Sequence, residues 1–201
     1  MRTGVFGGTF DPVHLGHVAM AEAAAMKFGL SSVLFLPARL SPHKTAPPTD
    51  ARHRVAMLAL ALAGRPDWSI ALDELDREGP SFTVDTLRAL SARSLQPDLR
   101  LLMGTDTLAG FARWKEPAEI VRLARIAAFY RDPFRGEGLV VPDVAGLADR
   151  LDVFDAGSVR ISSTELREKL SSGQRPSGLV PPSVAEYITK QGLYSAGVVQ
   201  S

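Results

Sequence analysis

Two histidines, His14 and His17, stand three residues apart at the end of a glycine-rich segment that begins at Gly7. The segment follows the apolar run 3–6 and precedes the alanine-rich stretch 18–28, an order that indicates a strand, a turn and a helix. Glycines allow a backbone to turn tightly and to approach a ligand closely. The start of a helix adds unpaired N–H groups and the positive end of a dipole, which both suit a phosphate. The spacing therefore predicts a phosphate-binding turn that presents two imidazoles.

The same two histidines allow two other interpretations, a helix cap and a metal site. Zinc-binding helices typically carry histidines four residues apart with a glutamate, and no third ligand is evident near His14 and His17. The chain contains no cysteine, which excludes disulfides, thiolate metal sites and cysteine nucleophiles. We favour hydrogen bonding to a phosphoryl group whose negative charge grows in the transition state, because glycines, helix start and histidines converge here.

Apolar runs of strand length alternate with helical stretches along the chain, which predicts an α/β fold. Strands are expected at 3–6, 32–36, 68–72, 99–103 and 126–130, with weaker ones at 139–141 and 152–154. Helices are expected at 18–28, 50–63, 83–92, 107–112, 117–123, 163–171 and 183–190, the second with Val55, Leu58 and Leu62 on one apolar face. Residues 37–49 hold four prolines with Arg39, His43 and Lys44, and they are typical of a stiff basic loop.

This order of elements predicts a doubly wound, mainly parallel Rossmann-like sheet with helices on both faces. Such sheets bind ligands beyond the carboxyl ends of their strands, where the strand order reverses, so the Gly7–His17 segment belongs at that edge. The dinucleotide pattern G-x-G-x-x-G is absent there, which argues against a nicotinamide-dependent oxidoreductase. With 201 residues we expect a single domain over residues 1–194 and a flexible tail over 195–201.

Composition and charge narrow the class of protein. A hydrophobic content of 45% with 22% charged residues is ordinary for a globular protein, and a net charge of +1 gives no general attraction to nucleic acid or membrane. No apolar run approaches the roughly 20 residues that span a bilayer, and the first residues lack the pattern of a signal peptide. We therefore expect a cytoplasmic protein that binds neither nucleic acid nor membrane, and a homo-oligomer stays open.

Six segments resemble the nicotinate-nucleotide adenylyltransferases of the H-x-G-H nucleotidyltransferase superfamily, and together they cover nearly the whole chain in the order of that family. They are residues 7–17 (G-G-T-F-D-P-[IV]-H-x-G-H), 37–44 (a loop with proline, histidine and lysine), 79–87 (G-P-S-[YF]-T-V-D-T-L), 104–115 (G-x-D, then F, then W-K), 161–167 (I-S-S-T-x-[IL]-R) and 180–188 (V-P-x-x-V-x-x-Y-I). One departure follows the strand at 126–130, where the family often has Arg-Pro-Gly and this chain has Arg131, Asp132 and Pro133.

The resemblance implies adenylyl transfer from ATP to nicotinate mononucleotide, which gives deamido-NAD and pyrophosphate in NAD biosynthesis. The nucleophile is a phosphate monoester with a second pKa of about 6, so it is anionic near neutral pH without a general base. The protein has to align two anions and neutralise their repulsion. We therefore expect a direct in-line attack without a covalent enzyme intermediate, with Mg²⁺ held mainly by the ATP phosphates and not by a carboxylate cage.

The resemblance also implies roles for individual residues. The expected catalytic residues are His14, His17, Lys44 and Arg167, of which His17 stabilises the α-phosphoryl group and Arg167 faces the leaving pyrophosphate. The expected ATP contacts are Gly7, Gly8, Phe10, His14, His17, Ile161, Ser163, Thr164 and Arg167. The expected mononucleotide contacts are Gly8, Thr9, Lys44, Thr83, Gly104, Asp106, Trp114 and Lys115, with Trp114 stacked on the pyridine ring.

Structural interpretations of some of these residues stay open. Ser162 to Thr164 could simply begin a helix, Asp106 could cap one, and Trp114 could belong to the core.

Other functions stay open as well. The enzyme could prefer nicotinamide mononucleotide or accept both mononucleotides. A phosphopantetheine adenylyltransferase is disfavoured, since such chains are typically shorter and lack the segments around Thr83 and Trp114. A nucleotide sensor without turnover is disfavoured by the intact set His14, His17, Lys44 and Arg167, because a mere binder has less need of groups that act in the transition state.

Overall fold

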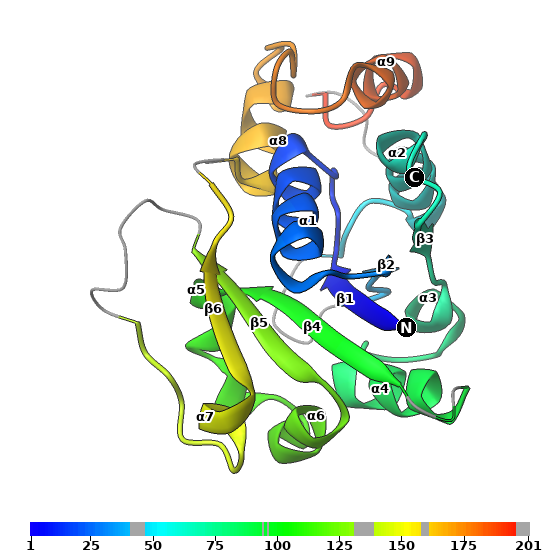
Figure 1. The fold of residues 1–201 in the computed structure, drawn as a ribbon. Coiled ribbons are helices and arrows are strands. Elements are labelled where there is room, and N and C mark those ends of the chain that lie inside the picture. Colours follow the sequence, from blue (N-terminus) through cyan, green and yellow to red (C-terminus); the bar gives the residue numbers. More distant parts are fainter. Residues whose placement is uncertain (41–46, 94, 96, 131–138, 158–160, 196–201) are drawn as a thin grey trace.

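The computed structural model describes residues 1–40, 47–93, 95, 97–130, 139–157 and 161–195 (Figure 1). His43, Lys44 and residues 131–133 and 196–201, on which several expectations rest, lie outside these ranges. The strands are β1 (Arg2–Gly8), β2 (Ser32–Pro37), β3 (Trp68–Ile70), β4 (Asp98–Gly104), β5 (Arg125–Tyr130) and β6 (Leu151–Asp155).

These strands form one sheet in the order β3-β2-β1-β4-β5-β6, and every neighbouring pair is parallel. The expectation of a doubly wound Rossmann-like sheet is therefore confirmed, with parallel pairing throughout the described strands. The chain leaves β1 toward β2 and leaves β4 toward β5, in opposite directions along the sheet. The strand order thus reverses between β1 and β4, and a ligand crevice is expected beyond their carboxyl ends.

The helices are α1 (Leu15–Phe28), α2 (Ala51–Leu62), α3 (Asp73–Asp76), α4 (Thr83–Ala92), α5 (Thr105–Leu108), the 3-10 helix η1 (Phe111–Arg113), α6 (Pro117–Leu123), α7 (Leu147–Arg150), α8 (Ser163–Ser171) and α9 (Pro182–Gln191). They cover both faces of the sheet, with α1, α2, α8 and α9 on one face and α4, α6 and α7 on the other (Figure 1).

Each face of the sheet has its own hydrophobic core, because successive side chains of a strand point to opposite faces. Phe6 and Leu102 face α1, whereas their chain neighbours Val5 and Leu101 face α4 and α6. Strands buried on both faces are near-continuous in apolar residues, and for this reason their positions could be expected from the sequence.

The predictions for two elements are wrong. Residues 107–112 do not form one helix, because α5 ends at Leu108 and η1 begins after Gly110. Residues 139–141 lie outside the sheet, and Val140 and Val141 are exposed, so their apolar character reflects no strand. The short helix α3 was not expected, since four residues leave little periodicity to detect.

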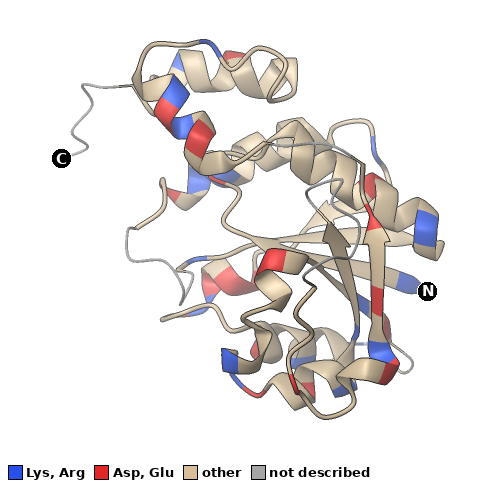
Figure 2. Ribbon diagram, turned by 90° about the vertical axis from the view of Figure 1, so that its left-hand side faces the viewer, with Lys and Arg blue, Asp and Glu red and all other residues tan. Residues whose placement is uncertain are grey.

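Charged residues of both signs are interspersed over the molecule (Figure 2). Any attraction for an anionic ligand must therefore come from the local placement of a few groups. Among the residues that the structure describes, no helix combines the length and apolar character that a membrane span needs.

Candidate functional site

The turn between β1 and α1 lies at the carboxyl end of β1, where the sheet order reverses. Its left-handed residue is Phe10, with a φ of 49°. The expectation that Gly7 and Gly8 make the turn is therefore wrong, because both belong to β1 and pair with the end of β2. The ring of Phe10 is buried against Phe6 and Phe35, so an ATP contact from Phe10 has to come from its backbone.

The two glycines differ in what surrounds them. A Cβ on Gly8 would lie 3.1 Å from the ring of Phe10, so a side chain there disturbs the packing of the turn. Among the described residues, a Cβ on Gly7 would meet no atom within 4 Å. Gly7 thus leaves open space at the carboxyl end of β1, where a ligand of a parallel sheet binds.

His14 and His17 cap the start of α1 together. The backbone N–H of His17 donates to Nδ1 of His14, and the backbone N–H of His14 donates to Nδ1 of His17, each over 3.3 Å. The two rings are stacked, with centroids 3.7 Å apart and an interplanar angle of 23°. The cap interpretation is therefore confirmed. The two hydrogen bonds fix both rings side by side at the positive end of a helix of 14 residues.

The caps also determine which ring nitrogens can donate. A neutral imidazole has one N–H, and a nitrogen that accepts a hydrogen bond carries none. Since Nδ1 of both rings accepts, Nε2 of both carries the hydrogen. His14 is only 3% exposed, whereas His17 is partly exposed and packs edge-on against Phe10. His17 is therefore the more accessible of the two donors.

Helix α8 meets this turn from the other end of the sequence. Ser163 Oγ donates to the carbonyl of Pro12 over 3.1 Å, and Nη1 of Arg167 donates to the carbonyl of Asp11 over 2.6 Å. Ser162 caps α8 by accepting from the N–H of Thr164, so the helix-start interpretation holds for Ser162. The expected group Ser163, Thr164 and Arg167 is thus brought beside the histidines. Ile161 is partly buried in the residues that lead into α8.

A second group of expected residues gathers around the start of α4. Thr83 is its first residue, and Lys115 reaches its first turn by an ion pair with Asp85 of 2.9 Å. The ammonium of Lys115 also lies 4.8 Å above the ring of Phe82. These contacts bring Thr83 and the Trp114–Lys115 segment together, although about 30 residues separate them in the sequence.

Trp114 is partly buried and packs against Phe111, with ring centroids 5.4 Å apart. Two residues later Glu116 adopts a left-handed backbone with a φ of 49°, and both of its carboxylate oxygens accept from Arg88 of α4. These hydrogen bonds lower the pKa of Glu116. The ion pair fixes the segment that carries Trp114 against α4.

Gly104 ends β4, and Asp106 follows in the first turn of α5. Asp106 is exposed in that first turn, and the N-cap position of α5 belongs to Gly104. Because β4 neighbours β1, both residues lie at the same sheet edge as the histidine pair.

The two groups are joined through the chain that leaves β2. The backbone N–H of Arg39 donates to Oγ of Ser81, and the N–H of Ser81 donates to the carbonyl of Leu40, each over 3.0 Å. The basic loop therefore departs from beside the start of α4. Lys44 itself lies outside the described residues.

Beneath this junction lies a buried carboxyl group, Glu74 of α3, which accepts from Oγ1 of Thr86 over 3.1 Å. Burial raises the pKa of Glu74, while hydrogen bonds from Thr86 and Ser81 and the charge of Arg77 act against that rise.

Three residues that hold the β1–α1 turn in place are not among the expected site residues, namely Asp11, Arg54 and Tyr194. One signal could have found Arg54, because it stands at helical spacing from Leu58 and Leu62 on the apolar face of α2. Arg54 is buried there, whereas Val55, which was expected on that face, is partly exposed. Asp11 and Tyr194 carry no comparable signal, since their contact depends on the tertiary fold.

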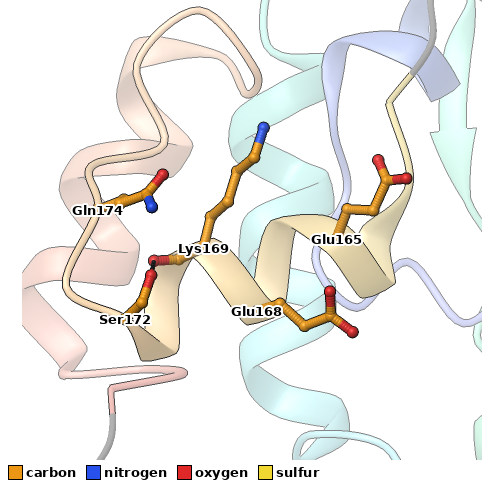
Figure 3. A pocket seen from close by; sticks show the side chains of 5 residues that line it. All are labelled: Glu165, Glu168, Lys169, Ser172 and Gln174. Carbon is orange, nitrogen blue, oxygen red and sulfur yellow. Dashed lines mark hydrogen bonds between the residues drawn. The ribbon is translucent and has the colours of Figure 1, made fainter.

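Two further observations on the described residues concern metal binding and a surface hollow. In the part of the chain that the structure describes, no group of three or more His, Cys, Asp or Glu side chains could hold a metal ion. A hollow of about 510 Å³ lies on another side of α8, lined by Glu165, Glu168, Lys169, Ser172 and Gln174 (Figure 3). None of the expected site residues lines this hollow.

Known proteins resemble this chain along most of its length. The sequence model of the cytidylyltransferase-like family matches residues 5–169. A Thermomicrobium roseum protein named "Probable nicotinate-nucleotide adenylyltransferase" is 38% identical, over 96% of this chain and 91% of that protein. A Dictyoglomus thermophilum protein with the same name is 36% identical, over 96% of this chain and 100% of that protein.

A solved structure, "Plasmodium falciparum nicotinic acid mononucleotide adenylyltransferase complexed with NaAD", matches with a TM-score of 0.77. The match covers 96% of this chain and 97% of that one, at 19% identity. At this identity the likeness is one of fold.

Proposed function

Because this chain belongs to the cytidylyltransferase-like family and, within it, to the nicotinate-nucleotide adenylyltransferases, we propose that it transfers the adenylyl group of ATP to nicotinate mononucleotide. The products are deamido-NAD and pyrophosphate. The observation that carries the proposal is the stacked pair of His14 and His17 at the start of α1, beside the point where the sheet order reverses.

In this proposal the triphosphate of ATP lies over the β1–α1 turn. Gly7 leaves room for it, and the start of α1 offers a positive dipole end. The Nε2–H groups of His14 and His17 donate to the phosphoryl oxygens, and His17, the more accessible ring, acts on the α-phosphoryl group. Such donors act without reorganisation, because the reciprocal caps already fix both rings.

Arg167 faces the β- and γ-phosphates, which become the leaving pyrophosphate. Its guanidinium uses Nη1 for the carbonyl of Asp11, and its planar fork has further donors that suit a phosphate. Ser163 and Thr164, at the start of the same helix, complete the contacts to the phosphates, Ser163 through its backbone N–H because its hydroxyl donates to Pro12. Lys44, which lies outside the described residues, is assigned to the phosphates as a point charge.

Nicotinate mononucleotide lies on the α4 side of the site. Trp114 stacks on the pyridine ring, and the start of α4 at Thr83 offers backbone N–H groups to its carboxylate. Thr9, Gly104, Asp106 and Lys115 surround the remainder of the nucleotide. Its phosphate attacks the α-phosphorus directly and in line, with no covalent enzyme intermediate. The attack needs no general base, because the phosphate is already anionic near neutral pH.

Mg²⁺ fits this scheme as a companion of ATP. The described residues provide no carboxylate cage, and Mg²⁺ typically keeps several waters and binds substrate phosphates with few protein ligands. The ion would reduce the charge of the triphosphate, while the residues of this chain align the two nucleotides.

The test is an assay of pyrophosphate release with ATP, Mg²⁺ and each mononucleotide in turn. We expect release with nicotinate mononucleotide, and its product identified as deamido-NAD by mass spectrometry. Equal efficiency with nicotinamide mononucleotide would mean dual specificity. Absence of release with either mononucleotide, while ATP still binds, would contradict the proposal and favour a nucleotide sensor.

A further inference from the structure

The backbone and side chain of Asp11 hold three segments that are far apart in the sequence. Oδ1 accepts from the hydroxyl of Tyr194 over 2.6 Å, Oδ2 accepts from the backbone N–H of Thr49 over 3.1 Å, and the carbonyl accepts from Arg167 over 2.6 Å. Asp11 is 6% exposed. A buried carboxylate of this kind is stable only when it is well hydrogen-bonded, so each of these donors matters.

A buried arginine reinforces the same turn. Arg54 is 1% exposed, and its guanidinium donates to the carbonyls of Thr9, Ala38 and Thr49, each over 2.8 Å. Burial lowers the pKa of Arg54, and the negative charge of Asp11 is the largest influence against that shift. Asp11 and Arg54 therefore depend on each other inside the protein, and together they hold the turn from both sides.

Tyr194 reaches Asp11 in an unusual conformation, near the end of the described chain. Its backbone is left-handed, with a φ of 64°, which residues other than glycine seldom adopt. Such a conformation persists only where surrounding contacts enforce it, and such residues cluster at functional sites. Burial raises the pKa of Tyr194, as does the neighbouring charge of Asp11, so the hydroxyl keeps its proton and donates.

We propose that Tyr194 is a positioning residue for the transfer reaction, an inference that rests on the proposed function. Its hydroxyl holds the carboxylate of Asp11, and the carbonyl of the same residue holds the guanidinium of Arg167. Asp11 stands three residues before His14, in the turn that α8 also contacts through Ser163. Tyr194 thereby fixes Arg167 relative to the histidine pair without touching either nucleotide.

The variant Tyr194→Phe tests this role, because it removes the hydroxyl and keeps the ring. We expect kcat to fall about tenfold and the Kd of ATP alone, measured by calorimetry, to rise several-fold, since small displacements of charged donors are costly. Circular dichroism and the thermal midpoint report whether the variant folds. Should it fail to fold, Asp11→Asn is the second variant, because it replaces one of the two acceptor oxygens with an NH₂ group, which only donates and so faces the donor of Tyr194 or of Thr49.

The matched control is Tyr187→Phe. The hydroxyl of Tyr187 also pairs with a side chain, Nδ1 of His53 at 2.9 Å, but this contact joins α9 to α2 and does not involve Asp11. We expect this control to keep the kcat and the ATP affinity of the unmodified protein. Unchanged kcat and ATP affinity in Tyr194→Phe, or equal losses in both variants, would overturn the proposal.

A double-mutant cycle with Arg167→Gln separates positioning from general stability. If Tyr194 acts through Arg167, its substitution adds little to the loss that Arg167→Gln already causes, whereas independent effects multiply and overturn the proposal.

The proposed function and the proposed role of Tyr194 fail in different ways. Absence of turnover in the unmodified protein contradicts the adenylyltransferase function, and the ATP affinities still decide on Tyr194.

Discussion

The imidazole ring of His17 lies flat on that of His14, and each ring accepts a hydrogen bond from the backbone of the other residue. One interaction thus serves two purposes. It completes the start of α1, and it fixes the tautomer of both rings with the hydrogen on Nε2. An exchange of either histidine therefore changes helix capping as well as the proposed chemistry, and variants are needed that separate the two.

The pair His14→Asn and His14→Ala makes this separation. Asparagine is among the best N-cap residues, so we expect His14→Asn to retain the free energy of unfolding, whereas His14→Ala loses about 1 kcal/mol of it. Both variants lose the Nε2–H donor, and turnover should fall in both by about 100-fold. Urea denaturation and pyrophosphate release measure the two quantities, and normal turnover in His14→Asn would show that His14 is only a cap.

For His17→Ala we expect turnover to fall by about 100- to 1000-fold while ATP still binds, because the lost donor acts mainly on the transition state. Calorimetry with ATP and the pyrophosphate assay check this. A variant with near-normal turnover would refute the role of His17.

Exchange of Trp114 should affect one substrate more than the other. We expect Trp114→Ala to raise KM for the mononucleotide by about tenfold and to leave KM for ATP nearly unchanged, because the indole is assigned to the pyridine ring. Trp114→Phe keeps an aromatic face and serves as the control, with a smaller rise. A selective loss of ATP affinity in Trp114→Ala would reverse the assignment.

Gly7→Ala should impair binding without impairing folding. The added methyl group meets no atom of the described part of the chain within 4 Å, so we expect the thermal midpoint to stay unchanged. The methyl group occupies the space assigned to the triphosphate, and KM for ATP should rise about ten- to a hundredfold. Gly8→Ala is the comparison, because its Cβ presses on Phe10 and should lower the thermal midpoint. Unchanged KM in Gly7→Ala would place ATP elsewhere.

The buried carboxyl of Glu74 gives a prediction for stability against pH. Its folded pKa is raised above the usual value of 4.5, so the folded protein binds this proton more tightly than the unfolded chain does. The contribution of Glu74 to stability is therefore greatest below about pH 4.5, declines as the pH rises to the raised folded pKa and is constant above it.

Glu74→Gln keeps an oxygen for the hydroxyl of Thr86 and cannot ionise. We expect its free energy of unfolding, relative to that of the unmodified protein, to be more favourable at about pH 7.5 than at about pH 4.5. Urea denaturation at the two pH values checks this. A difference that does not change with pH would show that Glu74 titrates alike in both states.

Local sequence patterns were sufficient for most of the elements. Helix α4 begins and ends where its amphipathic pattern does, and helices α6 and α8 have the expected bounds. Patterns failed where an element is set by contacts across the sheet. The strand β1 continues through Gly7 and Gly8 because β2 pairs with them, although glycine does not favour a strand.

By itself, the sequence determined the class of fold, the family and the turn with its two histidines, because periodicity and motif spacing are local properties of the chain. Only the tertiary structure decided that the histidines cap each other, that Phe10 and not a glycine makes the turn, and that Arg54 is buried. It also placed Tyr194 on Asp11, a contact across 183 residues. The physical reason is that a buried polar group takes whichever partner the packed elements bring within hydrogen-bond distance, and sequence spacing carries no record of that.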